Sequence, residues 1–226
     1  MRYKHKFIIS KPRWLDDSII NAAQCMLQMQ YGVPGLQNTL LGYNLTYNIM
    51  TKGFIQILHN GDNHWITVST VGLHPSHIRI YDSLYTSLSE FTKDQICALL
   101  HTAKPMISVQ FMNVQRQCNS YDCGVYAIAY ATSLCCGEDV SGIEYDNQKM
   151  RGHLLSCLEI GKITTFPSKQ RDKGNPLREE RIPVHCYCRM ADTGAMIECH
   201  TCQQWFHVKC DKSISKRCWK KPNYTW

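Results

Sequence analysis

The chain has 226 residues and carries 25 Lys and Arg against 18 Asp and Glu, which gives a formal net charge of +7. A composition of 44% hydrophobic and 19% charged residues is ordinary for a globular protein and excludes a disordered or fibrous chain. No apolar run approaches the ~18 residues that span a bilayer, so we expect no membrane partner. The run Phe7-Ile8-Ile9 is too short for a signal peptide.

Charge and cysteine content divide the chain into two regions. Residues 1–166 hold 13 basic and 12 acidic side chains, net +1, whereas residues 167–226 hold 12 basic and 6 acidic, net +6, together with six of the 13 Cys. Without an export signal, this many cysteines indicate metal sites and buried or reactive thiols in a reducing, intracellular compartment. Residues 167–184 are polar, charged and punctuated by Pro and Gly, which predicts a linker between domains at 1–166 and 185–226.

The first region predicts helices and strands in mixed order. Apolar residues recur at helical spacing from Ser18 to Tyr31, and short runs rich in aromatic and β-branched residues at 54–58, 65–71 and 78–81 predict neighbouring strands. A capping box at 92–95 predicts a helix to about residue 102, and a strand follows at 106–114. Two further helices cover 125–134 and 147–160. This mixture indicates an α+β domain.

Three segments place reactive side chains at the ends of these elements. His64 begins a strand, Asp82 ends the next strand, and Cys123 begins the apolar helix. A helix N-terminus and a nearby imidazole both favour a thiolate, so Cys123 is a candidate nucleophile and His64 its base. Asp82 could orient the imidazole, and Gln117 could donate to an oxyanion together with the Cys123 backbone N–H. The alternative is structural, since a single Cys in an apolar helix or a single His on a strand is usually a packing residue.

The same residues lie in four short blocks: Trp14-Leu15-Asp16-Asp17, His64-Trp65, Tyr81-Asp82-Ser83 and Gln117-x-Asn-x-x-Asp-Cys123-Gly124. Together the blocks closely resemble the ubiquitin-like protease (Ulp/SUMO protease) family of cysteine peptidases, over about residues 12–165. The resemblance implies a papain-like cysteine peptidase fold of the Ulp type, without a cofactor, and the four catalytic roles given above. It also implies that Trp14 and Trp65 cover a narrow tunnel around the substrate's C-terminal Gly-Gly, where a Cβ atom would not fit. Asp17 resembles a position at the substrate groove but could equally cap the following helix, and Trp14 could be a core residue.

Three closely spaced ligand pairs indicate a zinc module near the end of the chain: Cys186-x-Cys188, Cys199-x2-Cys202 and His207-x2-Cys210. With Trp205-Phe206 before the histidine they resemble a PHD-type zinc finger, a fold with two cross-braced zinc ions. The resemblance implies one complete site from Cys186, Cys188, His207 and Cys210. Cys199 and Cys202 would share the second ion with a final Cys pair that the sequence lacks, because Cys218 comes too early in the pattern. We therefore expect a finger that is truncated at its C-terminus.

PHD fingers often bind histone tails, and this implies a pocket in which Trp205 and Met196 line a lysine side chain. The alternative is that Trp205 only packs the small finger. The positive charge of this region could contact nucleic acid non-specifically, since no base-reading helix is evident.

The sequence thus predicts a thiol peptidase or isopeptidase that cleaves after the C-terminal Gly of a ubiquitin-like, most plausibly SUMO-like, modifier, in the nucleus. One alternative is a non-catalytic chromatin reader or adaptor whose peptidase-like domain is a scaffold. Another is a peptidase derived from a mobile element that acts on another substrate.

Overall fold

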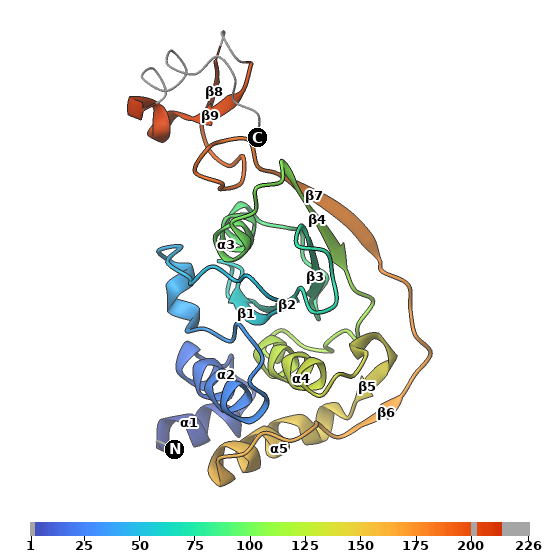
Figure 1. Ribbon diagram of the computed structural model, residues 1–226. Helices are drawn as coiled ribbons and strands as arrows, with labels where there is room; N and C mark the ends of the chain where they lie inside the picture. The colour runs from blue at the N-terminus through green and yellow to red at the C-terminus, as the bar shows by residue number, and fades with distance from the viewer. Residues whose placement is uncertain (1–2, 200–202, 214–226) are drawn as a thin grey trace.

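The strands expected from the sequence form the centre of one mixed sheet in the computed structural model, which describes residues 3–199 and 203–213 (Figure 1). The sheet has the order β1-β2-β3-β4-β7, with the strands β1 (Ile55–His59), β2 (Trp65–Ser69), β3 (His77–Tyr81), β4 (Met106–Phe111) and β7 (Arg178–Pro183). Strands β3 and β4 pair in parallel, and the other neighbours pair antiparallel.

Helices cover both faces of this sheet (Figure 1). The α-helices are α1 (Tyr3–Ile9), α2 (Asp17–Tyr31), α3 (Glu90–Leu100), α4 (Cys123–Cys135) and α5 (Asn147–Ile160). Short 3-10 turns lie at η1 (Thr39–Gly42), η2 (Val140–Gly142) and η3 (Val208–Ser213), and small two-stranded sheets pair β5 (Ile143–Tyr145) with β6 (Ser168–Gln170) and β8 (Met196–Glu198) with β9 (Trp205–His207). None of the described helices is long and apolar enough to cross a membrane.

Side-chain alternation along the strands produces two cores, one on each face of the sheet. Ile55 and Ile57 of β1 join the core beneath α4, whereas Leu58 of the same strand joins the core beneath α3. Helix α4 is buried almost all round, because the sheet lies on one side of it and α2 and α5 lie on the other. The α+β prediction is therefore confirmed.

Helix boundaries follow local capping. Asp16 accepts a hydrogen bond from the Ile19 N–H and starts α2, so the predicted alternative in which Asp17 caps this helix is wrong. Helix α3 begins at Glu90 because Ser89 accepts from the Thr92 N–H, three residues before the predicted capping box. A Ser at the N-cap satisfies an N–H of the first turn that would otherwise be unpaired.

The segment predicted as a charged linker at 167–184 contains two strands. Strand β6 pairs with β5, and β7 pairs with β4 along its full length, from Met106↔Pro183 to Phe111↔Arg178. Ile182 and Val184 are buried in the core beneath α3. The expectation of a linker is wrong, because Arg178-Glu179-Glu180-Arg181 forms a sheet edge on which Glu179 and Arg181 are exposed.

Residues 185–199 follow β7 closely in the chain, and several of them pack against the first region. The Arg189 guanidinium donates to the Ala103 carbonyl at 2.7 Å, and the Thr193 hydroxyl donates to the Asp94 carboxylate of α3 at 3.0 Å. Ala191 is fully buried in the core beneath α3. The C-terminal segment is thus joined to the first region by packing as well as by the chain.

Candidate active site

The sheet and α4 bring the three reactive segments together. His64 directly precedes β2, Asp82 directly follows β3, and these strands pair antiparallel with Thr67 opposite Tyr81. The Thr67 hydroxyl donates to the Ala127 carbonyl of α4 at 2.8 Å, which fixes the helix on β2. Cys123 is the first residue of α4. The predicted positions of all three side chains at the ends of these elements are confirmed.

His64 forms a buried pair with Asp82. The imidazole Nε2 donates to the Asp82 Oδ1 at 2.7 Å, and both side chains are at most 4% exposed. Burial lowers the pKa of His64, but its interactions with Asp82 and Cys123 outweigh this effect and raise the pKa to about 9. The other ring nitrogen, Nδ1, is buried and accepts no hydrogen bond of good geometry from the described residues. His64 is therefore held by the carboxylate, and the Cys123 thiol is close enough to contribute to its raised pKa.

Asp82 stays ionised because its loop surrounds it with donors. Burial alone would raise the pKa of this carboxyl, but hydrogen bonds from His64, Thr86 and the Leu84 N–H lower it below its ordinary value. The Leu84 N–H lies 2.8 Å from Oδ1, and the Thr86 N–H lies 2.7 Å from Oδ2. A carboxylate fixed in this way can orient a neighbouring imidazole and stabilise its protonated form.

Cys123 is 1% exposed and lies at the N-terminus of α4, where the Asp122 side chain makes no capping hydrogen bond. The next residue must be small. A Cβ atom on Gly124 would lie 3.0 Å from Leu15 Cβ and 3.2 Å from Trp65 Cδ1. The Gly that follows the candidate nucleophile therefore allows Trp65 to pack directly on the first turn of its helix.

Gln117 is buried and its amide is fixed at both ends. Its Oε1 accepts from the Ser83 hydroxyl at 2.6 Å, and its Nε2 donates to the Asn119 carbonyl at 2.6 Å. An amide nitrogen carries two protons, so one N–H of Gln117 remains for an oxyanion. Ser83 belongs to the same loop as Asp82, and this loop therefore orients two of the predicted catalytic side chains.

Trp14 and Trp65 differ in burial. Trp14 is 54% exposed, which rules out the alternative of a core residue, and its Nε1 donates to the Ser120 carbonyl at 2.6 Å. Trp65 is buried, and its Nε1 donates to the Leu15 carbonyl at 3.0 Å. Both rings line a groove of about 220 Å³ together with Asp17. The three predicted substrate-binding residues therefore share one groove.

A Cys/His cluster lies in the C-terminal segment. The ligand atoms of Cys186, Cys188, His207 and Cys210 lie within 4.8 Å of one another. The His207 Nε2 donates to the Ala191 carbonyl at 2.8 Å, while Nδ1 lies 3.4 Å from the Cys188 sulfur. An imidazole that donates through one nitrogen and faces thiols with the other has the arrangement of a zinc ligand. This donor set fits a tetrahedral zinc ion.

The second predicted ligand pair and the predicted lysine pocket are described only in part. The backbone of Cys199 bonds to Gln203 and Gln204 in a turn, but Cys202 lies outside the described residues, as do His200 and Cys218. The register of β8 and β9 places Met196 opposite His207 and therefore diagonal to Trp205 on the same face. Trp205 is 44% exposed.

Sequence comparison finds a family match within the first region. The family model described as the Ulp1 protease family, C-terminal catalytic domain, matches residues 52–154. This part of the chain is therefore similar to the catalytic domain of Ulp1-type cysteine proteases. The matched range includes all four predicted catalytic residues, whereas Trp14 and Asp17 lie before it.

Solved structures show the same fold. The SUMO protease Ulp1 with its catalytic cysteine oxidised to a sulfenic acid is 16% identical, with a TM-score of 0.55 over 72% of this chain and 85% of that chain. The C-terminal Ulp1 protease domain in complex with Smt3, the yeast ortholog of SUMO, is 17% identical, with a TM-score of 0.55 over 70% and 82%. A de-sumoylating protease is 13% identical, with a TM-score of 0.53 over 71% and 86%.

Two curated proteins of Schizosaccharomyces pombe match short parts of the chain. The Lid2 complex component lid2 is 35% identical over 49 residues, which are 22% of this chain and 3% of that protein. Multicopy suppressor of chk1 protein 1 is 46% identical over 33 residues, which are 15% of this chain and 2% of that protein. The chain therefore spans only a small fraction of these relatives.

Some residues of the site were not anticipated. Ser83 lay in a recognised block, yet its bond to Gln117 spans 34 residues and has no sequence signal. Thr86, which donates to Asp82 at 2.5 Å, had no signal either. Arg151 contacts Asp122, the residue before Cys123, from a helix in which the sequence analysis named no candidate site residue.

Proposed function

We propose that the chain is a cysteine peptidase that cleaves the peptide or isopeptide bond after the C-terminal Gly of a ubiquitin-like modifier, of which SUMO-like proteins are the best candidates. The observation that supports this most directly is the buried pair of His64 with the Asp82 carboxylate, together with Cys123 at the start of α4, whose thiol helps to raise the His64 pKa. The Ulp1-type domain and the structural similarity to a protease bound to Smt3 agree with this substrate class.

The side chains can carry out the reaction in two steps. His64 takes the Cys123 proton, and the thiolate attacks the carbonyl carbon of the terminal Gly. The oxyanion accepts hydrogen bonds from the Cys123 backbone N–H and from Gln117, and the imidazolium then protonates the leaving amine. Water, deprotonated by His64, hydrolyses the resulting thioester and releases the modifier and the free thiol.

The groove beside Trp14 and Trp65 supports a narrow, side-chain-free substrate tail. Trp65 packs on the first turn of α4, which begins with Cys123, and it lines the groove together with Trp14, so we expect a tail that reaches Cys123 along this groove to pass beside both rings. Glycine residues suit this path because they lack a Cβ atom. Asp17 at the groove is a candidate partner for a basic group of the modifier.

A panel of ubiquitin-like proteins with activated C-termini tests this function. We expect the full chain to form a covalent adduct with one class of modifier and Cys123→Ser to form none. Because the replacement is nearly isosteric, the variant should keep the unfolding midpoint of the wild type. Labelling of the variant at the wild-type rate would contradict the assigned nucleophile, and a folded wild type that labels with no probe would favour a scaffold or another substrate.

We also propose that residues 185–226 form a PHD-type finger that binds zinc through Cys186, Cys188, His207 and Cys210 and contacts a histone tail in the nucleus. The cluster geometry supports the metal, which would hold together a segment with too small a core to fold alone. The shared face of Met196 and the exposed Trp205 supports a lysine pocket.

Two measurements test the finger. About one tightly bound zinc ion per chain is expected, whereas two ions of equal affinity would make Cys218 a ligand and contradict the proposed assignment. Methylated and unmodified histone-tail peptides should lose binding on Trp205→Ala but keep it on Val208→Ala, a similarly exposed position of the same segment. Equal binding by both variants would show that Trp205 lines no pocket.

A further inference from the structure

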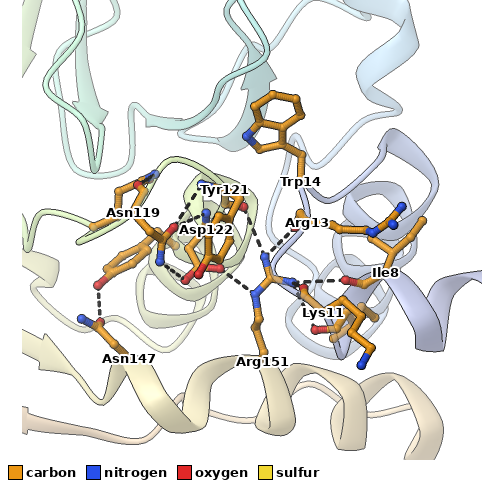
Figure 2. A network of polar contacts seen from close by, with 12 residues as sticks. Ile8, Lys11, Arg13, Trp14, Asn119, Tyr121, Asp122, Asn147 and Arg151 are labelled. Atoms are coloured by element: carbon orange, nitrogen blue, oxygen red, sulfur yellow. Dashed lines mark hydrogen bonds and ion pairs between the residues drawn. The ribbon is translucent and has the colours of Figure 1, made fainter.

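Arg151 of α5 is the centre of a network that joins two segments next to the candidate active site (Figure 2). Its Nε donates to the Asp122 Oδ1 at 2.6 Å. Its two terminal nitrogens donate to five backbone carbonyls at 2.6–3.3 Å, those of Ile8, Ile9, Lys11, Arg13 and Tyr121. The guanidinium therefore uses its fork of donors on several partners at once.

One joined segment carries the candidate nucleophile. Asp122 directly precedes Cys123, and its other carboxylate oxygen accepts from the Asn119 Nδ2 at 2.7 Å. The Asn119 Oδ1 accepts in turn from the N–H groups of Tyr121 and Asp122 at 3.0 Å. The Arg151–Asp122 pair is only 16% and 13% exposed, so the charge of this carboxylate is balanced by a nearly buried cation.

The other joined segment leads to Trp14. Residues 10–14 are exposed and lie between the buried side chains of Ile9 and Leu15. Arg151 holds the carbonyls of Lys11 and Arg13 at 2.7 and 2.6 Å, immediately before the tryptophan. These bonds fix the backbone of a segment that has little packing of its own.

Residues of both segments line a second groove, and Trp14 lines this groove as well as the first. The second groove has a volume of about 470 Å³ and is lined by Ile8, Pro12, Arg13, Trp14, Ser120 and Tyr121. Arg151 bonds to residues of both segments. Two contacts therefore hold the Trp14 ring near this loop: its own hydrogen bond to the Ser120 carbonyl, and the anchoring of the preceding backbone by Arg151.

We propose that Arg151 is a positioning residue that fixes Trp14 relative to the loop bearing Cys123. It thereby sets the width of the groove lined by Trp14 and Trp65, here called the slot, which admits the modifier's tail; this rests on the proposed function. Arginine is required because the planar guanidinium presents donors toward both segments, whereas a lysine carries its three protons on one nitrogen. Lysine can keep the pair with Asp122 but cannot also hold the carbonyls on both sides.

Kinetics of the full chain with a C-terminally fluorogenic ubiquitin-like substrate test the slot. Arg151→Lys should raise KM about tenfold and change kcat less than about threefold, because a displaced Trp14 weakens binding of the tail. Iodoacetamide should label Cys123 at nearly the wild-type rate, since this small reagent does not need the slot. Arg171→Lys is the matched control, because Arg171 joins the carbonyls of Ser141 and Asn113 away from the catalytic residues. An unchanged KM in Arg151→Lys, or a KM raised equally in the control, would overturn the proposal.

Trypsin tests the same anchoring without any activity of the chain. The carbonyl of the Arg13–Trp14 bond is the one that Arg151 holds at 2.6 Å. Cleavage requires local opening, so the fragment beginning at Trp14 should appear at least about tenfold faster in Arg151→Lys than in the wild type or in Arg171→Lys. Equal rates would overturn the role of Arg151. A wild type that hydrolyses no modifier substrate would count against the proposed function, and this measurement would then decide the anchoring alone.

Discussion

The imidazole of His64 makes the active site sensitive to pH through stability as well as through reactivity. Its pKa is raised from 6.5 to about 9 in the folded chain, so its contribution to stability is fully present below pH 6.5 and is lost as pH rises to about 9. The shift corresponds to at most about 3 kcal/mol. We expect the free energy of urea unfolding to fall over this window in the wild type. In His64→Gln this fall should be largely absent, and an equal fall in both proteins would assign it to other groups.

Substitution of Gln117 should lower kcat more than substitution of Ser83. Gln117→Ala removes a proposed oxyanion donor and should lower kcat about 10²–10³-fold with little change in KM. Ser83→Ala leaves the Gln117 amide in place but removes the hydroxyl that orients its Oε1. We therefore expect kcat to fall about tenfold, because the amide is held less precisely. Steady-state kinetics of both variants measure this order. A change confined to KM in Gln117→Ala would make it a substrate-binding residue.

Single residues were predictable where their chemistry is rare and their position in an element is distinctive. His64, Asp82 and Cys123 occupy element ends that the hydrophobic pattern already marked, and the structure pairs His64 with Asp82. Arg151 was not predictable because five of its six partners are backbone carbonyls, which are present at every position of every chain. Only the folded chain shows which carbonyls meet.

At the scale of elements, β7 is part of the protease core. Ile182 lies opposite Ile107 of β4 and is fully buried. Ile182→Ala should therefore destabilise the chain by about 2–5 kcal/mol. The neighbouring Arg181 is exposed, and Arg181→Ala should change stability by less than about 0.5 kcal/mol. Urea unfolding of the two variants tests this difference, and equal stabilities would show that β7 contributes no core packing.

The same strand shows why part of the fold could not be read from the sequence. The helix predicted at 147–160 agrees with α5 at both ends, because Asp146 caps its start and Gly161 ends it in the left-handed region with φ 79°. Strand β7 carries only one fully buried residue among its charges, so local composition favoured a linker. Its partner β4 lies far away in the sequence, and long-range pairing leaves no local pattern.

At the scale of the whole molecule, the Cys/His cluster is hydrogen-bonded to a residue of the core beneath α3. His207 of the cluster donates to the carbonyl of Ala191, and Ala191 is buried beneath α3. A chelator that removes the proposed zinc ion should loosen this contact and lower the thermal midpoint of the chain by about 2–8 °C, as expected for a loss of 1–2 kcal/mol. Cys186→Ser should start from the lower midpoint and show no response to the chelator. An unchanged wild-type midpoint after zinc loss would show that the two parts are stable independently.

The late position of β7 in the sequence has a consequence for the chain during its synthesis on the ribosome. The edge of β4 is complete only when residues 178–183 have been synthesised, and 72 residues separate Phe111 at the end of β4 from Pro183. At about 5–20 residues per second, this edge waits roughly 4–14 s for its partner. An unpaired strand edge is a template for pairing with other chains. The nascent chain is therefore most prone to aggregation, and most in need of a chaperone, while the charged residues of β7 are still being translated.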